Sequence, residues 1–169
     1  MSNNFVAIIM GSNSDFPLVK NTIEILDGLG IKSEVKVASA HRTPDVVSNY
    51  VKDAQERGCL VFICAAGLAA HLAGAVAART IRPVIGIPVD CGPLSGVDAL
   101  YSTVMMPYGI PVATVAVGKA GAKNAAYLAA QIMACSDKDL EEKILVNREN
   151  AAKAVMKANE ELQASLNAK

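Results

Sequence analysis

The sequence has no tryptophan, few other aromatic residues and only two histidines among its 169 residues. Aromatic residues make up 4% of the chain, whereas hydrophobic residues make up 52%. A core must therefore be built from closely packed Ala, Val, Ile and Leu side chains. So high an apolar content at this length also indicates subunit interfaces. The length itself suits one domain over residues 1–169.

An excess of charge of either sign is also missing, since sixteen acidic residues balance sixteen basic ones. This balance argues against a surface that binds nucleic acid or an anionic membrane, so any phosphate binding should be local. We therefore expect a small-molecule substrate as the partner.

Long apolar runs and paired cysteines are absent as well. The run over Phe5–Met10 is too short for a signal peptide and lacks a basic flank, and no uninterrupted stretch has the length of a membrane span. The four cysteines show neither metal-ligand spacing nor the framework of a secreted domain. We expect reduced thiols, no metal and a cytoplasmic protein.

Apolar runs alternate with helical patterns, which is typical of a parallel sheet between two layers of helices, a three-layer α/β/α fold. In the second run, Glu34 and Lys36 alternate with Val35 and Val37, which indicates a half-solvated edge strand. The predicted sheet is five-stranded and flavodoxin-like, with the order 2-1-3-4-5. The expected strands are Phe5–Met10, Ser33–Ala38, Leu60–Ala66, Pro83–Pro88 and Val112–Val117.

Helical patterns follow these strands, and Thr43 with Pro44 after it predicts a capped helix start. The expected helices are Asp15 or Phe16 to Leu29, Pro44–Arg57, about Ala69–Thr80, Val97–Val104, Ala120–Cys135 and Lys138 to about Leu166. The last is a C-terminal extension with an apolar stripe of Leu140, Ile144, Ala151, Val155, Leu162 and Leu166. We expect this stripe to pack on its own sheet or on a neighbouring subunit.

The predicted strand order places one crevice between strands one and three, where ligands bind outside the carboxyl ends of the strands. The loops that converge there are Gly11–Asp15, Ser39–Pro44 and Ala65–Gly74. Both histidines, His41 and His71, therefore fall at the same place.

The first of these loops, Gly-Ser-Asn-Ser-Asp, follows a strand and opens a helix. Its backbone N–H groups and the hydroxyls of Ser12 and Ser14 suit a phosphate at the positive end of the helix dipole. Asp15 suits the hydroxyls of a ribose. The alternative for the loop is a capping turn without a ligand, with Asp15 as a cap only.

His41 is the candidate proton carrier, because histidine ionises near neutrality and Arg42 beside it suits an anion. The alternative is an imidazole that only holds its loop. His71 is expected to be a neutral residue of the pocket wall. A two-histidine metal site lacks an acidic partner, and a nucleophilic Cys91 lacks an adjacent base.

Two further loops are predicted to form a lid or wall of the pocket. They are Asp90–Gly96, which contains Cys91, and the apolar segment Met105–Pro111 before the fifth strand.

Several motifs together carry a family resemblance: Gly-Ser-Asn-Ser-Asp, Ser-Ala-His-Arg-Thr-Pro, Ser-Gly-Val-Asp-Ala-Leu and Met-Pro-Tyr-Gly-Ile-Pro-Val-Ala-Thr-Val-Ala-Val-Gly. Over roughly Val6–Ile132 the chain resembles the class I N5-carboxyaminoimidazole ribonucleotide mutases, the PurE family of de novo purine synthesis. The resemblance implies a carboxyl shift from N5 to C4 of aminoimidazole ribonucleotide, through CO2, without a metal or organic cofactor. It also implies a homo-octamer whose active sites are lined by more than one subunit.

The resemblance assigns His41 as the acid and base, Ser12 and Arg42 to the phosphate, and Asp15 to the ribose. His71 matches a histidine that lines the pocket. The remaining expected substrate-binding residues are Gly11, Ser14, Ser39, Ala40, Gly67, Ala70 and Leu72.

The chain departs from the family at four positions, since Ala73, Ala75, Cys91 and Met105 stand where Pro, Met, Ser and Gln are usual. The class II enzymes, which carboxylate aminoimidazole ribonucleotide with CO2 directly, are less similar. They have Gly-Arg-Ser-Asn where Gly67-Leu68-Ala69-Ala70 stands here. Direct carboxylation is the alternative activity, and a non-catalytic nucleotide-binding module is the alternative from another class.

Overall fold

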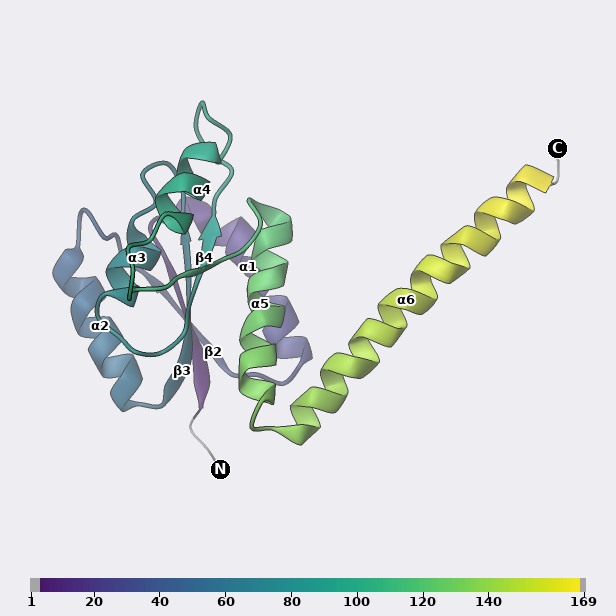
Figure 1. Cartoon of the computed structure of the whole chain (residues 1–169), viewed down its shortest axis with the longest axis horizontal. Coiled ribbons are helices and arrows are strands. Elements are labelled where there is room, and N and C mark those ends of the chain that lie inside the picture. Colours follow the sequence, from purple (N-terminus) through teal and green to yellow (C-terminus); the bar gives the residue numbers. More distant parts are fainter. Residues whose placement is uncertain (1–3, 168–169) are drawn as a thin grey trace.

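A computed structural model describes residues 4–167, in which five parallel strands form one sheet (Figure 1). Their order is β2-β1-β3-β4-β5, which confirms the predicted order 2-1-3-4-5. The strands are β1 (Phe5–Met10), β2 (Ser33–Val37), β3 (Cys59–Ala66), β4 (Val84–Pro88) and β5 (Ala113–Thr114).

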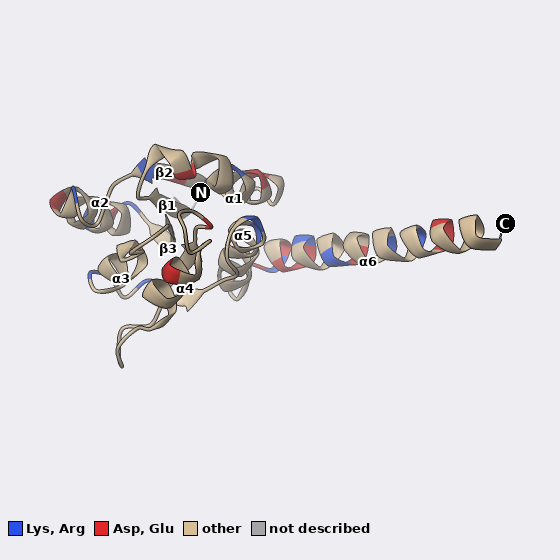
Figure 2. Ribbon diagram, turned by 90° about the horizontal axis from the view of Figure 1, so that it is seen from above, with Lys and Arg blue, Asp and Glu red and all other residues tan. Residues whose placement is uncertain are grey.

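Helices cover both faces of the sheet, which confirms the three-layer α/β/α architecture. Figure 2 shows α1 and α5 on one side of the strands and α2 and α3 on the other. The helical elements are η1 (Asn13–Asp15), α1 (Phe16–Gly28), α2 (Pro44–Glu56), α3 (Leu72–Ala77), α4 (Val97–Val104), α5 (Lys119–Ala134) and α6 (Lys138–Asn167).

The central strands are buried on both faces, which explains why they are apolar throughout. In β1, Val6 and Ile8 contribute to the core under α1 and α5, whereas Ala7 and Ile9 contribute to the core under α2 and α3. Strand β2 lies at an edge, as its alternating charges predict, and Val37 on it is 47% exposed.

The strand predicted over Val112–Val117 is too long, because the regular ladder between β4 and β5 ends early. The N–H of Val115 still donates to the Gly86 carbonyl at 3.1 Å, but the next bond to β4 comes from Gly118, which donates to Pro88 at 2.9 Å. A regular parallel ladder places the next donor two residues later, not three. The extra residue interrupts the regular ladder, so the strand ends before Val115 although Gly118 still bonds to the end of β4.

The helix predicted over Ala69–Thr80 is also shorter, since α3 begins only at Leu72. Before it, Leu68 has a φ of 55°, and the N–H groups of Ala70 and His71 donate to carbonyls two residues earlier. The segment before Leu72 is therefore a tight turn instead of a first helical turn.

Helix α6 leaves the rest of the chain after its first turns (Figure 1). Leu140 and Ile144 are buried at its base, and the Lys143 ammonium donates to the Leu29 carbonyl at 3.3 Å. All later residues that the structure describes are exposed. The stripe therefore packs on its own chain only as far as Ile144, and packing of the remainder on a neighbouring subunit stays a prediction. Within residues 4–167, no helix combines the length and apolar character needed to cross a membrane.

Candidate active site

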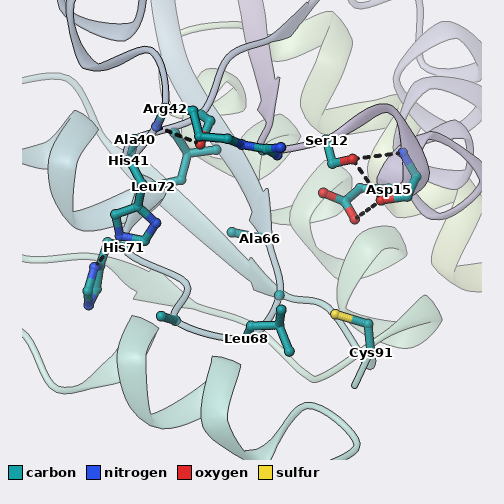
Figure 3. A pocket seen from close by; sticks show the side chains of 15 residues that line it. Ser12, Asp15, Ala40, His41, Arg42, Ala66, Leu68, His71, Leu72 and Cys91 are labelled. Atoms are coloured by element: carbon teal, nitrogen blue, oxygen red, sulfur yellow. Dashed lines mark hydrogen bonds between the residues drawn. The ribbon is translucent and has the colours of Figure 1, made fainter. Parts of the chain in front are cut away.

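A pocket of about 400 Å³ lies at the carboxyl ends of β1, β2 and β3 (Figure 3). Its volume is within the range of small-molecule sites. The residues that line it are Gly11, Ser12, Ser14, Asp15, Ser39, Ala40, His41, Arg42, Ala66, Gly67, Leu68, Ala69, His71, Leu72 and Cys91.

All of the residues predicted for the site line this pocket except Ala70, which is buried with 2% of its surface exposed. Four lining residues were not predicted as substrate contacts. Ala66, Leu68 and Ala69 belong to the loop after β3 that the topology already indicated, and Cys91 belongs to a loop predicted as a wall. The side chains of Ala66, Leu68 and Ala69 carry no polar group, so nothing in the sequence marked these three residues individually as substrate contacts.

The turn after β1 is held by its serines. Ser12 Oγ accepts from the Ser14 N–H at 3.3 Å and lies 2.9 Å from Ser14 Oγ. The Ser14 hydroxyl is also 3.4 Å from Asp15 Oδ1. Both hydroxyls therefore lie at the start of η1 and α1, where backbone N–H groups favour an anion.

Asp15 is buried although it lines the pocket, with 8% of its surface exposed. Burial raises the pKa of this carboxyl, while hydrogen bonds from the Ser12 backbone and the Ser14 side chain lower it in part. Asp15 occupies the position before α1 but makes no capping hydrogen bond with its side chain. The alternative that Asp15 is only a cap is therefore wrong.

The loop after β2 is closed by Ser39 and Thr43. The Thr43 hydroxyl donates to the Ser39 carbonyl at 3.1 Å and accepts from the Ser39 N–H at 2.9 Å, and the Arg42 N–H donates to Ser39 Oγ at 3.2 Å. Thr43 is the N-cap residue of α2 with Pro44 after it, as predicted, but its side chain makes no capping hydrogen bond. Its hydroxyl instead fixes the backbone on either side of His41.

The two histidines touch each other. His41 Nε2 lies 2.6 Å from His71 Nδ1, and the ring planes are nearly perpendicular at 82°. Because Ser39 and Thr43 already hold the loop, the His41 imidazole is not needed for that purpose. The sequence placed both residues in one crevice but did not predict this contact.

Across the pocket from the histidines lie Ser12 and Asp15, and the Arg42 side chain extends between the two sides toward Ser12 (Figure 3). The wall between them consists of small and apolar groups, including Ala66 and Leu68. A ligand that fills the pocket would therefore meet a cation and two hydroxyls at one end and an imidazole at the other.

Cys91 is a free thiol at the edge of the pocket, and a Cβ added at Gly67 would overlap its Sγ. Within residues 4–167 the thiol makes no hydrogen bond, which fits a wall residue. No residue of the predicted wall over Met105–Pro111 lines the pocket within this chain, so that wall stays a prediction. Ile110 instead packs with the core under α2 and α3. In the same described range, no three His, Cys, Asp or Glu residues are grouped as metal ligands.

Comparison with known proteins gives consistent matches over most of the chain. The model of the family described as AIR carboxylase matches residues 5–154. An N5-carboxyaminoimidazole ribonucleotide mutase of Bacillus subtilis is 51% identical over 157 residues, which cover 93% of this chain and 97% of that protein. The mutase of Escherichia coli K12 is 53% identical over 139 residues, 82% of each chain. The crystal structure of Treponema denticola PurE superposes with a TM-score of 0.85 at 30% identity and covers 94% of this chain and 98% of that one.

Proposed function

Since the chain belongs to the AIR carboxylase family, we propose that its pocket converts N5-carboxyaminoimidazole ribonucleotide to 4-carboxyaminoimidazole ribonucleotide, with His41 as general acid and base. A role as a mutase of purine biosynthesis follows from relatives that are about half identical. The observation that carries the proposal is the gathering of His41, Arg42, Ser12 and Asp15 around one pocket.

The proton transfers balance over one turnover. Protonated His41 donates its proton to N5 as the N5–carboxyl bond breaks and CO2 is released in the pocket. Carbon C4 then attacks CO2, and neutral His41 takes the proton that C4 loses. His41 is thus an acid first and a base second, and it ends in the protonation state in which it began.

The remaining side chains suit binding. The guanidinium of Arg42 and the hydroxyls of Ser12 and Ser14 provide donors for the phosphate, next to the N-terminus of α1. The buried carboxylate of Asp15 accepts from ribose hydroxyls, whose hydrogen bonds replace the water it has lost. The small apolar wall at Ala66 keeps CO2 close to C4 and away from solvent.

The test is a pair of assays on the purified protein, one with N5-carboxyaminoimidazole ribonucleotide and one with aminoimidazole ribonucleotide at low and high bicarbonate. We expect turnover of the N5-carboxy substrate at low bicarbonate. Turnover of aminoimidazole ribonucleotide with CO2, and none of the N5-carboxy form, would instead establish direct carboxylation, the alternative that the description of the matching family favours.

A His41→Asn variant separates an enzyme from a binding module. Loss of acid–base catalysis should lower kcat by about 10²- to 10⁴-fold while binding is largely kept. A module that only binds nucleotide has no turnover to lose, so the wild-type protein would then show none.

We further infer a cytoplasmic homo-octamer that needs no cofactor and binds neither nucleic acid nor membrane. The resemblance implies eight chains, and the exposed side chains of Leu145, Val155, Met156 and Leu162 on α6 support a contact between subunits. Light scattering should report a particle of eight chains, and a monomer would contradict the inference.

A further inference from the structure

We propose that His71 is a positioning residue for His41: its Nδ1 accepts the Nε2–H of His41 and so leaves Nδ1 of His41 as the nitrogen that moves the proton. The proposal deepens the function given above and rests on it. In this role His71 accepts a hydrogen bond from His41, in addition to lining the pocket.

The first step is the contact itself. At 2.6 Å, the space between His41 Nε2 and His71 Nδ1 holds a single proton, because two N–H groups would collide and two lone pairs would repel. The rings meet edge-on at 82°, with centroids 4.8 Å apart, so they are not stacked. One ring must donate and the other must accept.

The direction of the bond follows from the chemistry of the two rings. If His41 donates, both neutral rings carry their proton on Nε2, which is the preferred tautomer of a histidine side chain. If His71 donates, both rings must adopt the less favourable Nδ1–H form. The first arrangement therefore fixes His41 with a free lone pair on Nδ1.

His71 is placed firmly enough for this task. Its N–H donates to the Ala69 carbonyl and its carbonyl accepts from the Ala75 N–H, both at 2.8 Å, at the position just before α3. Nδ1 is the ring nitrogen nearer the backbone, and only the side-chain torsions χ1 and χ2 separate it from the fixed backbone of His71. The His41 loop is closed independently by Ser39 and Thr43.

The bond also acts during turnover. When His41 carries the transferable proton on Nδ1, it is an imidazolium whose Nε2–H still donates to neutral His71. Hydrogen bonds from charged donors are stronger than neutral ones, so the charged form is stabilised without a carboxylate partner. Partners that orient metal-bound histidines typically contribute about 10- to 100-fold to activity, and we expect a similar range for a partner that orients a catalytic histidine.

Three variants of His71 test the role kinetically. His71→Leu removes the acceptor, and we expect kcat to fall about 10- to 100-fold with KM nearly unchanged. His71→Asn places an amide oxygen close to the original Nδ1 and should restore most of the loss. His71→Gln is the matched control, because its amide lies near the original Nε2 and should not restore it. Equal kinetics for the Asn and Gln variants, or a change confined to KM, would overturn the proposal.

A spectroscopic measurement tests the same contact without turnover. The chain has only two histidines, so ¹⁵N-histidine labelling of the full assembly gives signals from two rings, and His71→Asn assigns them. At a pH where both rings are neutral, we expect Nε2–H in both, and a mixture of tautomers for His41 in His71→Leu. A wild-type His41 with its proton on Nδ1, or one unaffected by His71→Leu, would refute the proposal. Absence of mutase turnover would instead refute the proposed function.

Discussion

Gly67 gives a direct test of how the pocket wall is packed. A Cβ at this position would overlap Cys91 Sγ, whereas its next neighbours, Val89 Cβ at 3.5 Å and the Val89 carbonyl oxygen at 3.6 Å, are at ordinary contact distance. Gly67 is not among the residues with positive φ, so its backbone accepts alanine. The whole cost of Gly67→Ala should therefore arise from one thiol.

The size of that cost follows from overpacking. One extra methyl group in a closely packed site destabilises a protein by about 1–3 kcal/mol. Cys91→Ala removes the overlapping sulfur and leaves room for the methyl group. The double variant Gly67→Ala with Cys91→Ala should thus regain most of the stability, with a coupling energy of about 0.5–3 kcal/mol.

Urea unfolding of the four proteins at one protein concentration measures this cycle, because the stability of an assembly depends on concentration. In parallel, KM for the N5-carboxy substrate should rise in Gly67→Ala, since the displaced thiol enters the pocket, and should recover in the double variant. If Gly67→Ala costs the same free energy with and without Cys91, the proposed packing is incorrect and Gly67 is needed for another reason.

Three further substitutions test buried or paired groups. Burial raises the pKa of Asp15, so the ionised carboxylate destabilises the folded protein at pH 7. Asp15→Asn should therefore melt at a higher temperature than wild type at pH 7. Thermal scans should show that this difference disappears below the ordinary carboxyl pKa of 3.8. Arg57 lowers the pKa of half-exposed Glu34, so the ion pair stabilises the folded protein at pH 7. In urea unfolding, Glu34→Gln should lower the free energy of unfolding by less than about 1 kcal/mol at pH 7. This difference should disappear well below pH 4.5, where Glu34 is protonated. The buried Thr22 hydroxyl donates to the Ala122 carbonyl at 2.7 Å, so Thr22→Val should cost about 1–3 kcal/mol in urea unfolding, and Thr22→Ser should keep the bond.

The sheet could be predicted because its signals are local. The alternation of Glu34 and Lys36 with apolar residues indicates an edge strand without any knowledge of tertiary contacts. The strand order that follows from it predicts which loops converge on the site. Helix α4 has the predicted bounds, Val97–Val104. Strand β5 could not be predicted in extent, because its apolar run continues after the ladder with β4 is broken near Val115.

Details of the site depended on features that composition does not encode. The His41–His71 contact requires the tight turn before α3, and this turn depends on the positive φ of Leu68, which a leucine does not signal. An apolar stripe on α6 predicts that something covers it but does not identify the surface. The same limit applies to Met105–Pro111, which is apolar as expected for a wall but is mostly exposed in this chain, with Met105 and Tyr108 on the surface.

Helix α6 has a mechanical consequence. Leu140, Lys143 and Ile144 fix its base to its own chain, and the Tyr127 hydroxyl donates to Asn147 Oδ1 at 2.9 Å about one turn further along. The 20 residues from Arg148 to Asn167 extend about 30 Å beyond that anchor. With an arm of this length, a tilt of about 10° at the base moves the far end by about 5 Å. The surface that binds the far end of α6 therefore sets the angle of the helix at its base. That base contacts the end of α1, the helix that begins directly after Asp15.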